Sequence, residues 1–371
     1  MVIMDIRIDN FYQFKNFHMN MSYPKKIVDS TIEAEHLAGL PNFRYKKVNI
    51  IMGANASGKT SLGRLLMKFT NDFSDQNYTR FLSAINNKKK EASFQIDFVS
   101  QENILYRYIL KIIPGQNLLK DTPAAQTRLL HTEIGRRDNY ETCARRLDQL
   151  CEEGAETSDN ASTVDIDGWL FSYPTDSGEN KSYYTIEDRP EYIGILERIL
   201  KVLDPSIQAV IKLKEVENSY AIKMENQAII IQDGKINDST VLSSGTKAGL
   251  DISYIIASMI CDLHDFYYCD ELFSFVSSDV EKACLSIMIG KLKDRKQLFF
   301  TTHNTDILDM QLPKHSFTFL KKLVDGKNSS IQCVYASDFL KRNTDSLKNA
   351  VENDLFSIAP DLEKIYEIEE M

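Results

Sequence analysis

The sequence lacks the patterns that mark secreted and membrane-spanning proteins. Its six cysteines include no C-x-x-C pair, so neither a disulfide framework nor a redox motif is indicated. The longest apolar stretches, such as Tyr254–Cys261, fall well short of the ~18–20 residues that a membrane span requires. Asp5, Arg7 and Asp9 place charge where a secretion signal would be continuously apolar. These absences predict a reduced, water-soluble, cytoplasmic protein with no membrane partner.

An excess of basic residues is also missing. Lysine and arginine number 44 and aspartate and glutamate number 53, which gives a formal net charge of −9. This balance argues against a surface that is coated with positive charge to grip nucleic acid. Short basic runs such as 88–90 and 145–146 could still form a local groove, so DNA stays a possible partner.

What is present is a globular composition, 43% hydrophobic and 26% charged, over 371 residues. This length corresponds to two ordinary domains, or to one large domain with an insertion. Alternating residues within 1–22 predict a half-exposed strand. Apolar runs predict further strands at 48–52, 94–99, 104–113, 207–213, 219–223, 228–232, 266–269 and 297–301. Helical patterns occur at 59–69, 125–135, 139–152, 187–203, 246–262 and 278–292.

The segment between the two groups of strands has a different character. Residues 116–205 read as mainly helical around a polar, acidic loop at 152–165. A turn is expected at Asp233-Gly234, and a small hairpin with one or two helices after residue 303. The sequence therefore predicts an α/β core that is interrupted by a helical insertion.

Residues 53–60 read Gly-Ala-Asn-Ala-Ser-Gly-Lys-Thr and fit the pattern G-x-x-x-x-G-K-[ST] without a mismatch. Backbone N–H groups in such a loop surround a phosphate, and the following helix directs its positive N-terminus at the same anion. Lys59 would reach the outer phosphates and the Thr60 hydroxyl would ligate Mg²⁺. The predicted nucleotide-binding residues are Gly53, Asn55, Ala56, Ser57, Gly58, Lys59, Thr60 and Ser61.

This loop does not identify the reaction, because kinases, GTPases and motor ATPases share it. A GTPase would also carry an N-K-x-D motif that reads the base. The pairs Asn87-Lys88 and Asn180-Lys181 both lack the aspartate. A GTPase is therefore not indicated.

Two predicted strands end in residues that suit phosphate chemistry. Phe266–Cys269 is followed by Asp270, placed to hold Mg²⁺, and by Glu271, which could polarise an attacking water. The strand at 297–301 leads to His303, one helix and one strand after Glu271. Because α/β sheets bind ligands at the carboxyl ends of their strands, His303 could sense the terminal phosphate or the water.

A third feature precedes the helix that is predicted near 246. Ser243, Ser244 and Gly245 could bind an anion at the start of that helix, although an ordinary helix cap would look the same.

The order of these four elements resembles the ABC-type ATPases. Residues 53–60 look like their Walker A motif, 242–247 their signature motif, 266–271 their Walker B strand with a catalytic glutamate, and His303 their switch histidine. The resemblance runs over nearly the whole chain. It favours the SMC/RecF/OLD-like branch, particularly the bacterial ATPases of anti-phage defence systems.

The resemblance implies the head of an ABC-type ATPase, in which a mixed sheet with a P-loop core is joined to an antiparallel β-subdomain. Residues 1–115 would carry Walker A, 116–205 a helical insertion or lid, and 206–371 the signature, Walker B and switch histidine. It also implies ATP and Mg²⁺, with Glu271 and His303 as catalytic residues and Thr60 and Asp270 at the metal. Two chains would pack head to tail, so that the signature of one contacts the nucleotide of the other.

Some family features do not carry over. Gln95, Gln101 and Gln116 are all candidates for the glutamine of the family's Q-loop, and none is preferred. Ser243 follows Lys59 by 184 positions, which is too short a distance for the long coiled-coil arm of an SMC protein, and the 68 residues after His303 are too few for an OLD nuclease domain. The leading hypothesis is therefore a slow ATPase that dimerises on ATP and controls a separately encoded nuclease or toxin in antiviral defence. A RecF-like repair ATPase that is stimulated by DNA is the alternative, and a transporter subunit is a weaker one.

Overall fold

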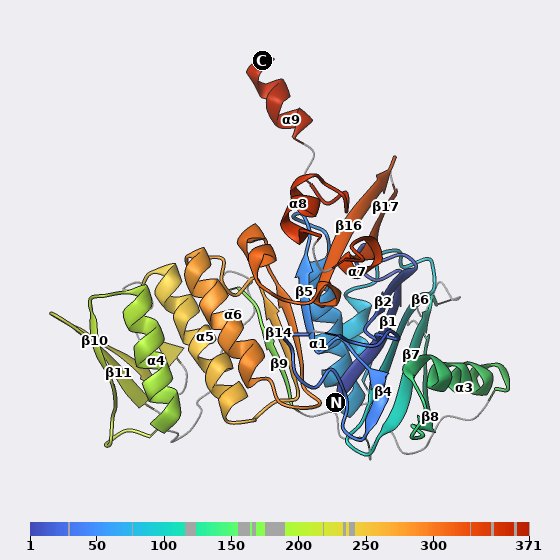
Figure 1. Cartoon of the computed structure of the whole chain (residues 1–371), viewed down its shortest axis with the longest axis horizontal. Coiled ribbons are helices and arrows are strands. Elements are labelled where there is room, and N and C mark those ends of the chain that lie inside the picture. Colours follow the sequence, from blue (N-terminus) through green and yellow to red (C-terminus); the bar gives the residue numbers. More distant parts are fainter. Residues whose placement is uncertain are drawn as a thin grey trace.

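The computed structural model describes most of the chain, in three lobes that follow one another across Figure 1. The described residues are 1–28, 30–75, 77–115, 124–154, 164, 168–174, 190–217, 219–232, 235–236, 242–326, 328–342, 345–359 and 362–370. Most of the acidic loop expected at 152–165 and the turn at Asp233-Gly234 lie outside them. None of the described helices is long and apolar enough to cross a membrane.

A six-stranded mixed sheet forms the centre. Its order is β17-β16-β5-β15-β14-β9, and all neighbours are parallel except the β16–β17 hairpin. The strands are β5 (Val48–Met52), β9 (Trp169–Ser172), β14 (Phe266–Asp270), β15 (Gln297–Thr301), β16 (Phe317–Asp325) and β17 (Asn328–Tyr335). β5, β14 and β15 are buried along their whole length, as expected for parallel strands that are covered on both faces.

A five-stranded antiparallel sheet lies beside it, on the α1 side in Figure 1. Its order is β2-β1-β6-β7-β8. The strands are β1 (Val2–Asp9), β2 (Phe17–Asn20), β6 (Ala92–Val99), β7 (Ile104–Ile113) and β8 (Ala124–Glu133), next to a small pair β3 (His36–Leu37) and β4 (Leu40–Arg44). Helix α1 (Lys59–Asp75) shares one apolar core with this sheet and with Phe266 and Tyr268 of the central sheet. Contacts with both sheets therefore fix the direction of the helix that follows the phosphate loop.

The third lobe is a four-stranded antiparallel sheet that packs on two helices. Its strands are β10 (Ile207–Lys212), β11 (Ser219–Met224), β12 (Ala228–Gln232) and β13 (Lys235–Ile236). They share a core with α4 (Pro190–Leu203) and α5 (Ser244–Ile260), while α5 and α6 (Ser278–Lys291) cover the central sheet. The remaining elements are α2 (Thr79–Leu82), α3 (Tyr140–Glu152), η3 (Thr305–Asp309), η4 (Lys314–Ser316), α7 (Ala336–Phe339), α8 (Leu347–Glu352), α9 (Glu363–Tyr366) and η5 (Glu367–Glu370).

The structure corrects two expectations about residues 116–205. The helix predicted at 125–135 is wrong, because 124–133 form β8, which pairs with β7 along ten residues. β9 lies in the same segment and extends the central sheet beside β14, although no strand was predicted there. The described part of the segment thus adds a strand to each of two sheets and is not wholly helical.

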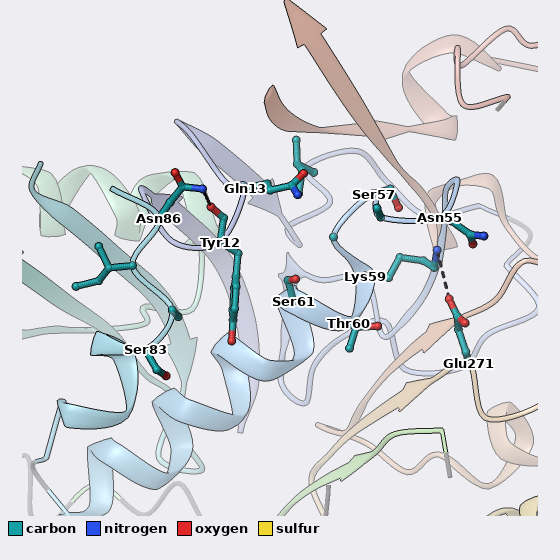
Figure 2. Close-up of a pocket in the computed structure, with 15 residues that line it drawn as sticks. Tyr12, Gln13, Asn55, Ser57, Lys59, Thr60, Ser61, Ser83, Asn86 and Glu271 are labelled. Atoms are coloured by element: carbon teal, nitrogen blue, oxygen red, sulfur yellow. Dashed lines mark hydrogen bonds and ion pairs between the residues drawn. The ribbon is translucent and has the colours of Figure 1, made fainter. Parts of the chain in front are cut away.

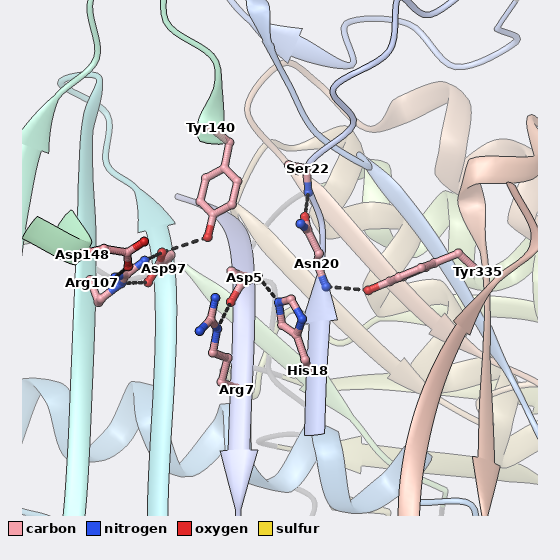
Figure 3. A network of polar contacts seen from close by, with 10 residues as sticks. All are labelled: Asp5, Arg7, His18, Asn20, Ser22, Asp97, Arg107, Tyr140, Asp148 and Tyr335. Carbon is pink, nitrogen blue, oxygen red and sulfur yellow. Dashed lines mark hydrogen bonds and ion pairs between the residues drawn. The ribbon is translucent and has the colours of Figure 1, made fainter. Parts of the chain in front are cut away.

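The strand predicted within 1–22 is also more deeply buried than expected. Val2 and Met4 face one core while Ile3, Ile6 and Ile8 face another, so β1 is covered on both sides. Asp5 on this strand is 1% exposed, and it accepts from Arg7 and lies 2.5 Å from His18 (Figure 3).

A second buried ion pair anchors α3 to the same sheet (Figure 3). Arg107 on β7 donates from Nε and Nη2 to the two carboxylate oxygens of Asp97 on β6, at 2.8 and 2.7 Å. The hydroxyl of Tyr140, the first residue of α3, donates to the same carboxylate at 2.9 Å. Burial raises the pKa of Asp97, and the Arg107 guanidinium opposes that shift. Because Asp97 has no exposed surface, its charge depends on these partners.

Candidate functional site

The predicted phosphate loop joins β5 to α1 at the carboxyl edge of the central sheet. β5 ends at Met52, and α1 begins at Lys59. Gly53 has φ +156°, and a Cβ atom there would lie 2.4 Å from the carbonyl oxygen of Leu320. Gly58 has φ +101°, which also favours glycine. The two glycines therefore allow a loop that side chains at these positions would obstruct.

The side chain of Lys59 lies within this loop. Its Nζ donates to the carbonyl oxygen of Gly53 at 2.9 Å and lies 3.1 Å from Nε2 of His303 and 3.5 Å from Oε1 of Glu271 (Figure 2). Burial lowers the pKa of Lys59, and the carboxylates of Glu271 and Asp270 oppose that shift. The ammonium group is thus held by protein acceptors at a point where a phosphate could replace them.

The side chains of Thr60 and Asp270, the two predicted Mg²⁺ ligands, are in direct contact. The Thr60 hydroxyl donates to Oδ2 of Asp270 at 2.6 Å, and the Thr301 hydroxyl donates to Oδ1 at 2.8 Å. Burial raises the pKa of Asp270, while the two hydroxyl donors lower it. A hydroxyl oxygen beside a carboxylate is the kind of oxygen donor set that Mg²⁺ uses.

Glu271 and His303 are also brought together. Nε2 of His303 lies 2.7 Å from Oε1 of Glu271, and this hydrogen bond lowers the pKa of the carboxyl group. Glu271 has φ +46°, and its N–H donates to Thr301 at the end of the neighbouring strand. A left-handed conformation in a residue other than glycine is uncommon and often occurs at functional sites.

A pocket of about 410 Å³ opens beside the loop. One wall is the phosphate loop with the start of α1, and the other is formed by Tyr12, Gln13 and residues 83–86 (Figure 2). Ser57 Oγ and Gln13 Oε1 are buried and have no hydrogen-bond partner among the described residues. Buried polar atoms usually have partners, so these two indicate a polar ligand. The volume is typical of a small-molecule site, and the donors and acceptors suit a nucleotide with Mg²⁺.

The signature candidates do not join this pocket. Ser243 caps α5 by accepting from the N–H of Thr246 at 3.1 Å, and Ser244 is exposed. A Cβ atom on Gly245 would lie 2.9 Å from the carbonyl oxygen of Phe275. None of the three lines the pocket that holds the phosphate loop. Their contact with a partner's nucleotide therefore stays a prediction.

One buried residue that supports the site was not indicated by any sequence pattern. Glu281 on α6 is 3% exposed and accepts from Thr302 Oγ1 and Asn304 Nδ2, both at 2.7 Å. These two residues flank His303, so Glu281 fixes the loop on both sides of the histidine. Burial raises the pKa of Glu281, and the two donors lower it.

The candidate glutamines lie elsewhere. Gln101 donates to Asp265 at 3.0 Å, Gln95 does not line the pocket, and Gln116 lies outside the described residues. Gln13, which the sequence did not single out, does line it.

Comparisons with known proteins agree with this geometry. The family model described as "AAA domain, putative AbiEii toxin, Type IV TA system" matches residues 48–309, more than half of the chain. No curated protein matches.

Solved structures resemble the chain in fold. An SMC head bound to the C-winged helix domain of ScpA aligns with a TM-score of 0.51 and 13% identity, over 92% of this chain and 100% of that one. An SMC head with an extended coiled coil, bound to the C-terminal domain of ScpA derived from Pyrococcus furiosus, gives 0.50 and 11%, over 91% and 97%. A RecF structure gives a TM-score of 0.41 and 11% identity over 90% and 98%, too low a score to bear on fold or function. The SMC likenesses confirm the predicted α/β fold of an ABC-type ATPase head.

Proposed function

The chain belongs to the family of AAA domains whose model matches residues 48–309, and on that premise we propose that it is an ATPase that dimerises on ATP. We further propose that it controls a separately encoded effector in antiviral defence. The proposed ATPase activity is supported by one observation: three strand ends that are far apart in the sequence come together around Lys59. Its Nζ lies 3.5 Å from Glu271 and 3.1 Å from His303, and the adjacent Thr60 hydroxyl lies 2.6 Å from Asp270. Arrangements of this kind serve phosphoryl transfer to water.

Each residue then has a chemical role in hydrolysis. Lys59 exchanges its contact with Glu271 for the outer phosphates of ATP, and the loop N–H groups bind the same phosphates. Thr60 and Asp270 would hold Mg²⁺, which would offset the charge that develops on the phosphate oxygens. Glu271, a carboxylate beside Lys59 and His303, accepts a proton from the attacking water. His303 holds the Glu271 carboxylate in place through the 2.7 Å contact.

The place of the signature residues supports the proposed dimerisation. Ser243, Ser244 and Gly245 are absent from the chain's own nucleotide pocket, and Ser243 already satisfies one N–H of its own helix. The other N–H groups in the first turn of α5, with the positive end of the helix dipole, are then available to a phosphate that a second copy binds. In this arrangement ATP joins two chains head to tail, and hydrolysis separates them.

The test compares ATP-dependent association of the unaltered chain with that of two variants. Lys59→Ala removes the phosphate contact, and Ser244→Arg places a large side chain on the exposed face of the signature without the clash that substitution of Gly245 would cause. Addition of ATP should not increase the association of either variant in analytical ultracentrifugation, whereas it should increase that of the matched control Ser244→Ala. Normal ATP-dependent dimerisation of both variants would refute the proposal.

The effector is a further part of the proposal. The description of the family refers to a toxin and a toxin–antitoxin system, which supports a role beside a toxic partner. Residues 116–205 are the proposed region for recognising a trigger or partner. Co-purification of a neighbouring gene product with the Glu271→Gln variant in ATP, but not with Lys59→Ala, is expected. Equal recovery with both variants would contradict ATP-dependent control.

A further inference from the structure

A second pocket, of about 480 Å³, lies away from the nucleotide site and combines positive charge with apolar surface. Four lysines line it, and no aspartate or glutamate occurs among its described lining residues. Apolar side chains, including Leu312 and Leu340, share the wall with them. We call this pocket the basic groove; its lysines are Lys25, Lys26, Lys314 and Lys341.

The basic groove is firmly built. Nε2 of His315 lies 2.6 Å from Oε1 of the buried Glu35, and the ring of Tyr23 packs on the imidazole at 4.5 Å. Thr31 donates to the carbonyl oxygen of Gln311 at 2.7 Å, which ties its two rims together. Rigid walls lower the cost of binding, since little has to be ordered when a ligand enters.

The lysines of the groove differ in how far they are neutralised. Lys314 lies 3.9 Å from Asp345 and Lys341 donates to a backbone oxygen, whereas Lys25 and Lys26 are exposed and form no ion pair with a described residue. At Lys25 and Lys26 the groove therefore presents positive charge without a described ion-pair partner, beside apolar surface. A matching ligand would be acidic and apolar together.

The chain itself carries such a segment. Residues 362–370, which we call the acidic segment, contain four glutamates and one lysine. Its apolar side chains stand in solvent: Leu362 is 41% exposed, Ile365 59%, Tyr366 61% and Ile368 64%. Figure 1 shows α9 standing clear of the body, and the hydrogen bonds of this segment stay within it among the described residues. Exposed apolar clusters of this kind usually mark an interaction site.

We propose that the acidic segment of one copy docks into the basic groove of a second copy. The occupant is a second copy because the segment projects away from its own body, and because the same two surfaces on each chain allow a reciprocal exchange with twofold symmetry. The apolar residues supply contact area in the groove, and the glutamates face the lysines. This contact needs no nucleotide, so it goes beyond the proposed ATP-dependent dimer.

Charge reversal tests the contact on the full chain without nucleotide. Lys25→Glu with Lys26→Glu puts glutamates in place of the two groove lysines that form no ion pair with a described residue, and Glu367→Lys with Glu369→Lys makes the segment basic; all four positions are exposed. Each double variant should associate at least about tenfold more weakly than the unaltered chain in analytical ultracentrifugation at low salt. An equimolar mixture should recover the association, because the new glutamates of the first variant then meet the new lysines of the second, while the unaltered segment of the first meets the unaltered groove of the second.

The outcomes separate the alternatives. Recovery on mixing supports exchange between copies. Failure to recover on mixing refutes it, as would happen if the segment folded onto its own groove. Unchanged association of both variants also refutes it. A groove variant that loses affinity for a short DNA duplex, with no change in association, would overturn it in favour of a nucleic-acid site. Unchanged binding of a fluorescent ATP analogue confirms that each variant is folded, so failure here leaves the ATPase proposal intact.

Discussion

Replacing Glu271 by glutamine separates the chemical step from nucleotide binding. Glutamine keeps the shape of the side chain but cannot accept a proton from water. Because a positioned general base typically contributes a factor of 10² to 10⁴, we expect ATP turnover to fall by at least about a hundredfold. ATP-bound dimers should persist, since hydrolysis is the step that separates them.

The same substitution should strengthen ATP binding. At 3.5 Å the Lys59–Glu271 pair would be worth about 5 kcal/mol at an effective dielectric constant of ~20. Glu271 is 26% exposed and shares its oxygen with His303, so solvent and the second partner reduce this to about 1 kcal/mol. ATP must break this pair to reach Lys59. We therefore expect an affinity for ATP that is about fivefold higher.

Two measurements check this prediction: steady-state phosphate release and titration with a fluorescent ATP analogue. Glu225→Gln, which removes the same charge at an exposed site outside the pocket, serves as the matched control and should change neither value. Turnover of Glu271→Gln within about threefold of the unaltered chain would refute the assignment of Glu271 as the base.

Three further substitutions test buried contacts, one in the five-stranded sheet and two beside the site. Arg107→Ala leaves the buried Asp97 without its cation, so the free energy of unfolding should fall by about 3–5 kcal/mol in a denaturant titration, and a loss below 1 kcal/mol would contradict this. Gly63→Ala would place a Cβ atom 2.5 Å from the Tyr268 ring, so the free energy of unfolding should fall by about 1–3 kcal/mol. Adding Tyr268→Leu to this variant should recover part of the loss. Glu281→Ala should lower kcat about tenfold with little change in ATP affinity, because it frees the His303 loop. The kcat of Glu281→Gln should lie between those of the unaltered chain and Glu281→Ala. Equal rates for all three proteins would exclude this positioning role.

Local patterns were enough to single out the candidate residues of the site, because each one sits at a strand end or in a short loop. The spacing of Gly53–Thr60 is itself the geometry of the phosphate loop. The apolar strands before Asp270 and His303 predicted that both residues leave the same edge of one sheet, and the contacts of Lys59 and Thr60 agree.

Residues whose environment depends on distant segments were not predictable in this way. Ala124–Glu133 is rich in good helix formers, yet ten cross-strand pairs with β7 outweigh that preference. β9 has four residues, too few to show a period of its own. β1 looked half-exposed because its residues alternate. In the structure two cores cover its two faces, which the sequence of a single strand cannot reveal.

The sequence by itself singled out the loop at residues 53–60, the two carboxylates and the histidine, because each of these signals lies in residues that are close in the chain. The tertiary structure alone decided what surrounds them. Glu281 holds the His303 loop and Gln13 reaches the pocket through contacts between elements far apart in sequence. It also placed four lysines in one groove, although residues 25 and 341 are more than three hundred positions apart. Side chains from distant segments meet only when the sheets bring their edges together, and no local pattern records that.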